Sequence, residues 1–281
     1  MAMPLVVGVD GSEASLEAVD WAAREARWHR APLCLIHVAD GGCPPEDQGG
    51  TAAGLTDTAV ARAASGAPEV SLTSEVLRGA DPAAALIERG RNALAVVLGA
   101  RGRGTLEGLL VGSVSLAVAG RADCPAIVVR GAPEHRRDRF GSVVVGIEDG
   151  AGSGTALEFA HREARARGCG LVVVHAGREP LRGTAHRPFS TQDAPDGGRR
   201  RPAEVLDAAL DGLGGGYPDV PVERRVVDAP ARQALLAAAS EADLLVVGGH
   251  RRTGHFTLHL GLVSHGVLHH APCPVAVAPQ I

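Results

Sequence analysis

The sequence contains one succession of segments twice. Residues 5–27, LVVGVDGSEASLEAVDWAAREAR, reappear as residues 143–165, VVVGIEDGAGSGTALEFAHREAR. Three further segments recur in the same order: 33–38 with 171–176, 94–104 with 244–254, and 122–129 with 271–278. Ordered recurrence of this kind indicates duplication of a whole unit. It predicts two domains, residues 1–131 and 141–281, joined by a polar linker rich in Gly, Pro and Arg.

Each copy alternates short apolar runs with amphipathic stretches. PLVVGVD and LCLIHV are typical of strands buried on both faces, and the residues after Ser12 place Leu16, Val19, Ala23 and Ala26 at helical spacing. Ser12 is expected to cap that helix, and Asp81 with Pro82 is expected to begin another. Strands alternating with helices predict the α/β class, with a doubly wound parallel sheet of the Rossmann-like type in each copy.

Composition excludes several classes of protein. The net charge is −4, whereas nucleic-acid binding needs a concentrated excess of Lys and Arg, so we expect no nucleic-acid partner. No apolar run approaches the roughly 18 residues of a membrane span, and the first residues lack a signal-peptide pattern. We expect a cytoplasmic protein without a membrane partner. The five cysteines have no C-x-x-C spacing, which fits neither a disulfide framework nor a zinc knuckle.

A glycine-rich stretch follows the fourth apolar run of the first copy. Gly99, Gly102, Gly112 and Ser113 form the pattern G-x2-G-x9-G-S, which then leads into an apolar helix. A phosphate site needs backbone N–H groups in a concavity, no Cβ where the phosphate approaches, and a helix N-terminus behind it. These residues, with the amide of Val114, could supply all three. The alternative is that the glycines only make a turn and that Ser113 only caps the helix.

Three segments of the first copy carry a resemblance to a known family. VVGVDGSEAS, GARGRGTLEGLLVGSVS and DCPAIVVR together resemble the ATP-binding subgroup of the universal stress proteins, in their tandem two-domain form. The resemblance implies a fold like that of the adenine nucleotide alpha hydrolases. It also implies that the ligand is ATP, either alone or as its Mg²⁺ complex. It implies triphosphate and ribose contacts at the residues of the glycine pattern: Gly99, Gly102, Gly112, Ser113 and Val114.

The resemblance also assigns residues at the ends of the first two strands. Asp10 matches an acidic residue that approaches the nucleotide, with Gly8 beside it, and Val38 matches a residue whose backbone contacts adenine. The residues themselves agree in part, because a carboxylate at the carboxyl end of a parallel strand can reach a ribose hydroxyl or Mg²⁺. The alternative role of Asp10 is that of a turn residue.

The second copy departs from the glycine pattern. In the sequence alignment, Gly249 keeps the first glycine, Arg252 replaces the second, and the interval to Gly261 is one residue shorter. Leu262 stands in place of the serine, and Glu148 in place of the aspartate. We expect this copy to bind ATP weakly or not at all.

The predicted function is that of an ATP-binding module in a stress response, acting as a regulator rather than as an enzyme. A slow ATPase or nucleotidyl transferase and a nucleotide-free interaction scaffold are the alternatives, and no catalytic residue is assigned. No metal site is expected, because the histidine pairs His255/His259 and His265/His269 have no further ligands nearby in sequence. The resemblance also implies pairing through the last strands, either in a homodimer or between the two copies within one chain.

Overall fold

The computed structural model describes residues 2–39, 52–102, 110–148, 153–177, 201–212, 219–249 and 260–279. Ten strands belong to this part of the chain, five in each repeat. The first repeat contains β1 (Leu5–Val9), β2 (Leu33–Ala39), β3 (Leu72–Arg78), β4 (Ala95–Gly99) and β5 (Ala126–Val129). The second contains β6 (Ser142–Ile147), β7 (Gly170–Ala176), β8 (Val222–Val227), β9 (Leu244–Gly249) and β10 (Val275–Pro279).

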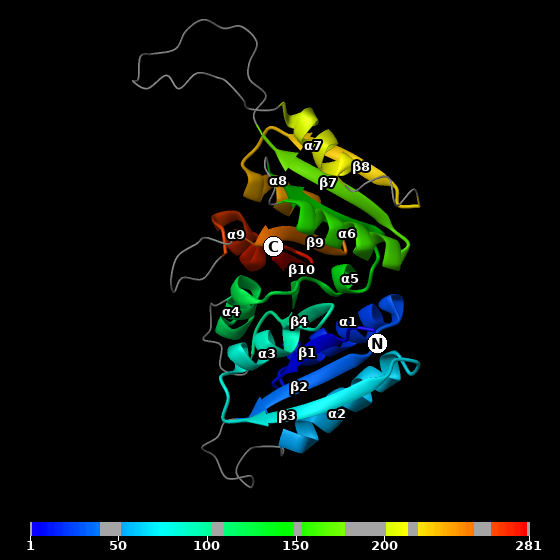
Figure 1. The fold of residues 1–281 in the computed structure, drawn as a ribbon, viewed down its shortest axis with the longest axis vertical. Helices are drawn as coiled ribbons and strands as arrows, with labels where there is room; N and C mark the ends of the chain where they lie inside the picture. Colours follow the sequence, from blue (N-terminus) through cyan, green and yellow to red (C-terminus); the bar gives the residue numbers. More distant parts are fainter. Residues whose placement is uncertain are drawn as a thin grey trace, which may run out of the picture.

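All ten strands form one continuous sheet in the order β3-β2-β1-β4-β5-β10-β9-β6-β7-β8. Figure 1 shows this sheet running through the whole molecule, with the first repeat in one half and the second in the other. Within each repeat every pairing is parallel. The predicted α/β class and doubly wound parallel sheet are therefore confirmed.

Helices cover both faces of the sheet. They are α1 (Glu13–His29), α2 (Ala52–Gly66), α3 (Pro82–Gly90), α4 (Ser113–Arg121), α5 (Pro133–Arg136), α6 (Gly154–Arg167), α7 (Pro202–Asp211), α8 (Ala231–Ala239) and α9 (Leu262–His270). Side chains of α1, α2, α6 and α7 share one apolar cluster, and those of α3, α4, α8 and α9 share the other. Among the described residues, no helix combines the length and the hydrophobicity that a bilayer span requires.

Local sequence signals explain where the helices of the first repeat begin. The Ser12 hydroxyl accepts the N–H of Ser15, and the Asp81 carboxylate accepts the N–H of Ala84 ahead of Pro82. Both predicted caps are confirmed. A side-chain acceptor at this position satisfies an N–H that has no partner within the helix, which stabilises a helix by about 1 kcal/mol.

The two repeats join through their last strands. β5 and β10 pair antiparallel, and Ile127 lies opposite Ala276. These two residues occupy equivalent positions in the repeats, so the junction lies on a pseudo-twofold axis. Because β4 and β9 pair with the outer edges of β5 and β10, neither strand keeps an unpaired edge for a second copy. Of the two predicted modes of pairing, the structure has the one within a single chain.

The linker between the repeats contains ordered structure of its own. It contains the short helix α5, which begins at Pro133, a residue suited to the first helical position. The ring N–H of His135 donates to the backbone oxygen of Ala242 at 2.8 Å, which anchors the linker to the second repeat. Gly131 has φ +85°, and a Cβ there would lie 1.7 Å from the Pro272 oxygen, so only glycine fits.

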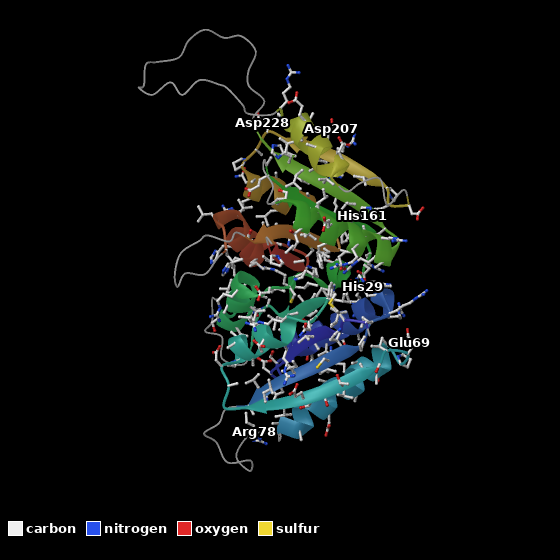
Figure 2. All side chains as sticks on the ribbon, viewed as in Figure 1. His29, Glu69, Arg78, His161, Asp207 and Asp228 are labelled. Atoms are coloured by element: carbon white, nitrogen blue, oxygen red, sulfur yellow. The ribbon has the colours of Figure 1, made fainter. Side chains whose placement is uncertain are left out.

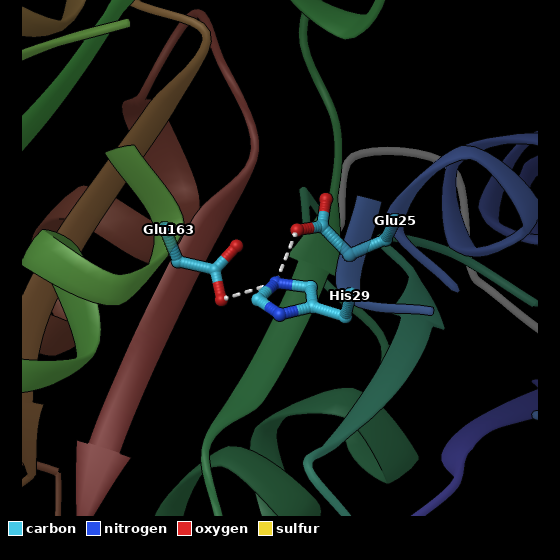
Figure 3. Close-up of side chains that lie close together, drawn as sticks. All are labelled: Glu25, His29 and Glu163. Atoms are coloured by element: carbon cyan, nitrogen blue, oxygen red, sulfur yellow. Dashed lines mark hydrogen bonds and ion pairs between the residues drawn. The ribbon is translucent and has the colours of Figure 1, made fainter. Parts of the chain in front are cut away.

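A buried cluster of charged side chains connects α1 to α6 beside this junction (Figure 3). His29 Nε2 lies 3.2 Å from Oε1 of Glu25 and 3.2 Å from Oε1 of Glu163. Arg167 lies 2.5 Å from Oε2 of Glu25, 2.7 Å from Oδ1 of Asp138 and 3.7 Å from Oε2 of Glu163. Each glutamate therefore contacts the imidazole with one oxygen and the guanidinium with the other.

Burial and close contact shift the protonation equilibria of this cluster. Burial alone would lower the pKa of His29, but hydrogen bonds to Glu163 and Glu25 raise that pKa to about 9. Burial raises the pKa of Glu25 well above its usual range, against the attraction of Arg167. The pKa of Glu163 is lowered, because its hydrogen bonds to Glu25 and His29 outweigh the effect of burial. The pKa values of the two carboxyl groups are therefore shifted in opposite directions.

Candidate nucleotide-binding site

The predicted site residues meet at the carboxyl end of the first repeat's sheet. The strand order places β1 between β2 and β4, so all three strands end at the same edge. α1 leaves β1 toward one face of the sheet, whereas α3 and α4 pack on the opposite face. Chain connections diverge at such a switch point and leave a crevice beyond the strand ends, where α/β proteins bind ligands.

Asp10 follows β1 directly and is held by a tight turn. Its Oδ1 accepts the backbone N–H of Ser12 at 2.9 Å and the Ser12 hydroxyl at 2.6 Å. A carboxylate held by two donors has a fixed direction, unlike a solvated surface aspartate. One oxygen of Asp10 thus has the alternative role in the turn, while the second oxygen, Oδ2, lies beside Gly102.

Gly102 and Gly99 lack side chains for different reasons. A Cβ on Gly102 would lie 2.4 Å from Oδ2 of Asp10, so the absent side chain lets the loop pass beside that carboxylate. A Cβ on Gly99 would lie 2.5 Å from the Ala14 oxygen and 2.9 Å from the Ser15 nitrogen. Gly99 therefore makes room for the first turn of α1, and only Gly102 shapes the surface beside Asp10.

The N-terminus of α4 lies at the same edge. Gly112 is its N-cap and makes no side-chain cap bond, and Ser113 is the first helical residue, with its side chain exposed. The alternative in which Ser113 merely caps the helix is therefore wrong. The Gly112 N–H donates to the Ala100 oxygen at 2.8 Å, which ties the helix start to the end of β4. The amides of Ser113 and Val114 occupy the first turn, where the helix dipole favours an anion.

Gly8 and Val38 lie at the neighbouring strand ends. Gly8 is buried, and a Cβ there would lie 2.7 Å from Leu98 and 3.1 Å from Leu86, so packing alone requires a glycine. Val38 is half-buried next to the last residue of β2 and packs on the α3 and α4 side. A backbone contact from Val38 to adenine and a nucleotide contact beside Gly8 remain predictions.

Two polar residues that hold this edge together were missed in the sequence. The buried Ser115 hydroxyl donates to the Gly99 oxygen at 2.8 Å, and His37 Nδ1 donates to the Val9 oxygen at 2.7 Å. A signal was available, because the second repeat carries Ser264 and His175 at the equivalent positions. Polar residues that recur inside apolar segments indicate buried hydrogen bonds.

Those bonds correct the alignment of the second repeat. The Ser264 hydroxyl donates to the oxygen of Gly248 at 2.9 Å, as Ser115 does to Gly99. The strand registers agree, because Gly99 lies opposite Val129 in β5 and Gly248 opposite its counterpart in β10. The residue equivalent to Gly99 is thus Gly248, and the assignment to Gly249 is wrong by one position.

This register removes the expected one-residue difference in the loop. The interval from Gly248 to Gly261 equals that from Gly99 to Gly112. Arg251 then takes the place assigned to Arg252, and both arginines lie outside the described residues. The sequence-based alignment failed because VVGG offers two adjacent glycines, and only the hydrogen-bonding partner distinguishes them.

The corresponding edge of the second repeat has different chemistry. Leu262 is the first residue of α9 and is 94% exposed, so an apolar side chain stands where the first repeat has a hydroxyl. Glu148 replaces the aspartate, and its N–H donates to the Ser153 hydroxyl at 2.9 Å. The second repeat thus keeps the strand-to-helix framework but loses the serine at the helix N-terminus.

Fold and site together define a Rossmann-like α/β protein with a glycine loop at the switch point of its sheet. The model of the Universal stress protein family matches residues 1–130 and again residues 139–279. The chain belongs to the universal stress protein family.

Known members of the family span the whole chain. A universal stress protein of Mycobacterium tuberculosis H37Rv is 36% identical over 293 residues, which cover 98% of this chain and 97% of the relative. A crystal structure of a universal stress protein from Archaeoglobus fulgidus superposes with a TM-score of 0.69 at 18% identity, covering 99% and 98% of the two chains. An A. fulgidus universal stress protein in complex with dAMP covers 46% of this chain and 98% of its own, at 28% identity and a TM-score of 0.39.

Proposed function

We propose that the first repeat binds ATP and that the second repeat does not. The observation that carries this proposal is the position of Gly102, whose missing side chain leaves the loop against Oδ2 of Asp10 at the switch point. A fixed carboxylate, a glycine loop and an uncapped helix start meet there, and these are the elements that ribose and phosphate binding need. Membership of the universal stress protein family supports an adenine nucleotide as the ligand.

In the proposed complex each group has a distinct task. The first-turn amides of α4 at Ser113 and Val114, with the Ser113 hydroxyl, bind the phosphates. Asp10 binds a ribose hydroxyl or a phosphate-bound Mg²⁺, because a carboxylate suits either partner. The backbone at Val38 contacts adenine. The proposed site thus contacts the nucleotide mainly through backbone groups.

The proposed role is that of a nucleotide-dependent regulatory module in a stress response. The family supports this role, and the site supports binding more than catalysis. Among the predicted site residues, Asp10 is the sole ionisable side chain, and one of its oxygens is already engaged by Ser12. A general base needs a free lone pair aimed at the attacking group.

Isothermal titration with ATP, ADP and dAMP tests the proposal directly. We expect ATP to bind the purified chain with a stoichiometry of one. Gly102→Arg fills the space beside Asp10 and should abolish binding. Ser113→Leu copies the second repeat and should weaken ATP by about 10- to 150-fold, because a hydrogen bond to a charged group is worth about 1.5–3 kcal/mol.

Leu262→Ser is the matched control, since it makes the same exchange at the second repeat. It should leave both the stoichiometry and the affinity unchanged. Absence of ATP and ADP binding in the unmodified chain would overturn the proposal and favour a nucleotide-free scaffold. Undiminished binding in Gly102→Arg would overturn the location of the site.

A further inference from the structure

The cluster between α1 and α6 contains three side chains that can ligate a metal. Nε2 of His29 and one carboxylate oxygen each from Glu25 and Glu163 lie within 4.8 Å of one another. Figure 2 places His29 near the junction of the two repeats, far from Arg78 and Asp207 toward the ends of the molecule. We propose that these three residues form a binding site for a divalent transition-metal ion, Zn²⁺ in the first instance, that clamps the first repeat to the second.

The distances fit the proposal. Zinc bonds to histidine nitrogen and glutamate oxygen are about 2.0–2.2 Å long, so two ligand atoms of a tetrahedral site lie about 3.3–3.5 Å apart. The separations of His29 Nε2 from the two Oε1 atoms are both 3.2 Å. The third separation, between the two carboxylate oxygens, is within 4.8 Å, so small side-chain movements bring all three ligand atoms to one ion.

A single hydrogen on Nε2 of His29 cannot bond fully to both carboxylate oxygens that face it. Nε2 carries at most one hydrogen, yet it faces two carboxylate oxygens at equal distance. Oε2 of Glu163 is buried and accepts no hydrogen bond among the described residues, and its ion-pair contact with Nε of Arg167 is long, at 3.7 Å. Figure 3 shows the Glu163 carboxylate turned toward His29 and Glu25, so this group belongs to the same cluster. A cation among the three ligands would compensate both carboxylates at once.

The pseudo-twofold axis accounts for the meeting of two carboxylates. Glu25 and Glu163 are equivalent residues of the two repeats, and so are His29 and Arg167. Like charges brought together by symmetry require positive charge beside them, and Arg167 supplies it on the side of the two Oε2 atoms. Histidine in one repeat supplies a ligand, whereas arginine in the other cannot ligate. The duplication has thus yielded a three-ligand set that neither repeat holds alone.

Neighbouring groups hold the glutamates in place, as outer residues do in metal sites. Arg167 lies 2.5 Å from the outer oxygen of Glu25 and 2.7 Å from Asp138. Its guanidinium stacks on the rings of Trp21 and Trp28, 5.2 and 4.9 Å from the centroids. This arginine is therefore fixed against the two carboxylate oxygens that do not contact His29.

Access to the trio is through the histidine. The side chain of His29 is 10% exposed, against 1% for Glu25 and 3% for Glu163. A water on that side would be the fourth ligand, as is usual where the protein supplies three. The ion replaces the hydrogen on Nε2, which leaves as a proton.

The experiment measures zinc binding to the untagged full chain after treatment with a chelator. Isothermal titration with ZnCl₂ should give one tight site, and elemental analysis should find one equivalent after dialysis. Glu163→Gln should weaken binding by more than the roughly 10- to 100-fold that loss of an outer residue costs, and His29→Gln should do the same. The matched control is His265→Gln/His269→Gln, which removes two neighbouring histidines of α9 and should leave this site unchanged.

X-ray absorption of the zinc-loaded unmodified chain gives a second measurement that depends on no variant. One imidazole with two or three oxygen ligands is expected. Two or more imidazoles, or loss of binding in the α9 control instead, would place the metal elsewhere and overturn the proposal. Absence of stoichiometric zinc would also overturn it. Because this site lies at the repeat junction, ATP binding by Glu163→Gln tests the nucleotide proposal separately.

Discussion

Gly102→Ala should destabilise the first repeat through a single contact. The added Cβ would lie 2.4 Å from Oδ2 of Asp10, about 1 Å closer than carbon and oxygen atoms normally pack. A clash with the end of a flexible side chain usually costs little. Here the carboxylate cannot turn away freely, because its other oxygen accepts two bonds from Ser12, at 2.9 and 2.6 Å.

The size of the effect follows from those bonds. Moving Asp10 out of contact breaks at least one hydrogen bond to a charged group, which costs about 1.5–3 kcal/mol. Replacing glycine by alanine restricts the unfolded chain and returns about 0.4–1 kcal/mol. The free energy of unfolding should therefore fall by about 0.5–2.5 kcal/mol. In an Asp10→Ala background the contact is gone, so Gly102→Ala should be neutral or stabilising there.

Urea denaturation of the four members of this double-mutant cycle measures the coupling. Fluorescence of the two tryptophans, Trp21 and Trp28, reports on α1 in the first repeat. Gly66→Ala is the control, since a Cβ at the end of α2 meets nothing within 4 Å and should not lower stability. An equal cost of Gly102→Ala with and without the Asp10 carboxylate would refute the reasoning.

Three further predictions concern the junction and the thiols. Gly131→Ala forces a left-handed φ of +85° on alanine and a clash with Pro272, so the urea midpoint should drop by the equivalent of at least about 1–2 kcal/mol. Arg167→Met leaves buried carboxylates without their guanidinium and should lower the free energy of unfolding by about 3–5 kcal/mol. For either variant, an unchanged urea midpoint would contradict the estimate. Burial raises the pKa of Cys124 to about 11 and of Cys273 to about 12. At pH 8 iodoacetamide should therefore alkylate both only in urea, and labelling of the native protein, detected by mass spectrometry, would argue against their burial.

Much of the fold could be predicted because it depends on local signals. Apolar runs between helical patterns predicted parallel strands, and the residues around Ser12 and Asp81 predicted two helix starts. The repeat itself predicted that the two halves share one architecture. Each of these inferences uses residues close together in the chain, where periodicity and capping chemistry act.

The parts that could not be predicted depend on contacts between distant residues. Gly248 and Gly249 are adjacent, so the sequence alone does not show which of them corresponds to Gly99. The hydrogen bond from Ser264 identifies Gly248. The cluster at the junction joins His29 to Glu163 in another repeat, and the charge pattern of either helix gives no sign of it. Sequence periodicity shows which face of a helix is buried, but not what lies opposite.

The duplication separates residues that serve the fold from residues that serve the proposed ligand. Gly8 makes room for a leucine of α3, and Gly146 makes room for the equivalent leucine of α8. In both repeats a serine hydroxyl of the last long helix, α4 or α9, also donates to the end of the preceding strand, β4 or β9. Features present in both repeats are thus explained by packing. Asp10 and Ser113 are replaced in the second repeat by a longer acid and by an exposed leucine, although the helix start is kept. Because the fold accommodates both replacements, the sheet itself does not require an aspartate and a serine at these positions, and we propose that the ligand does.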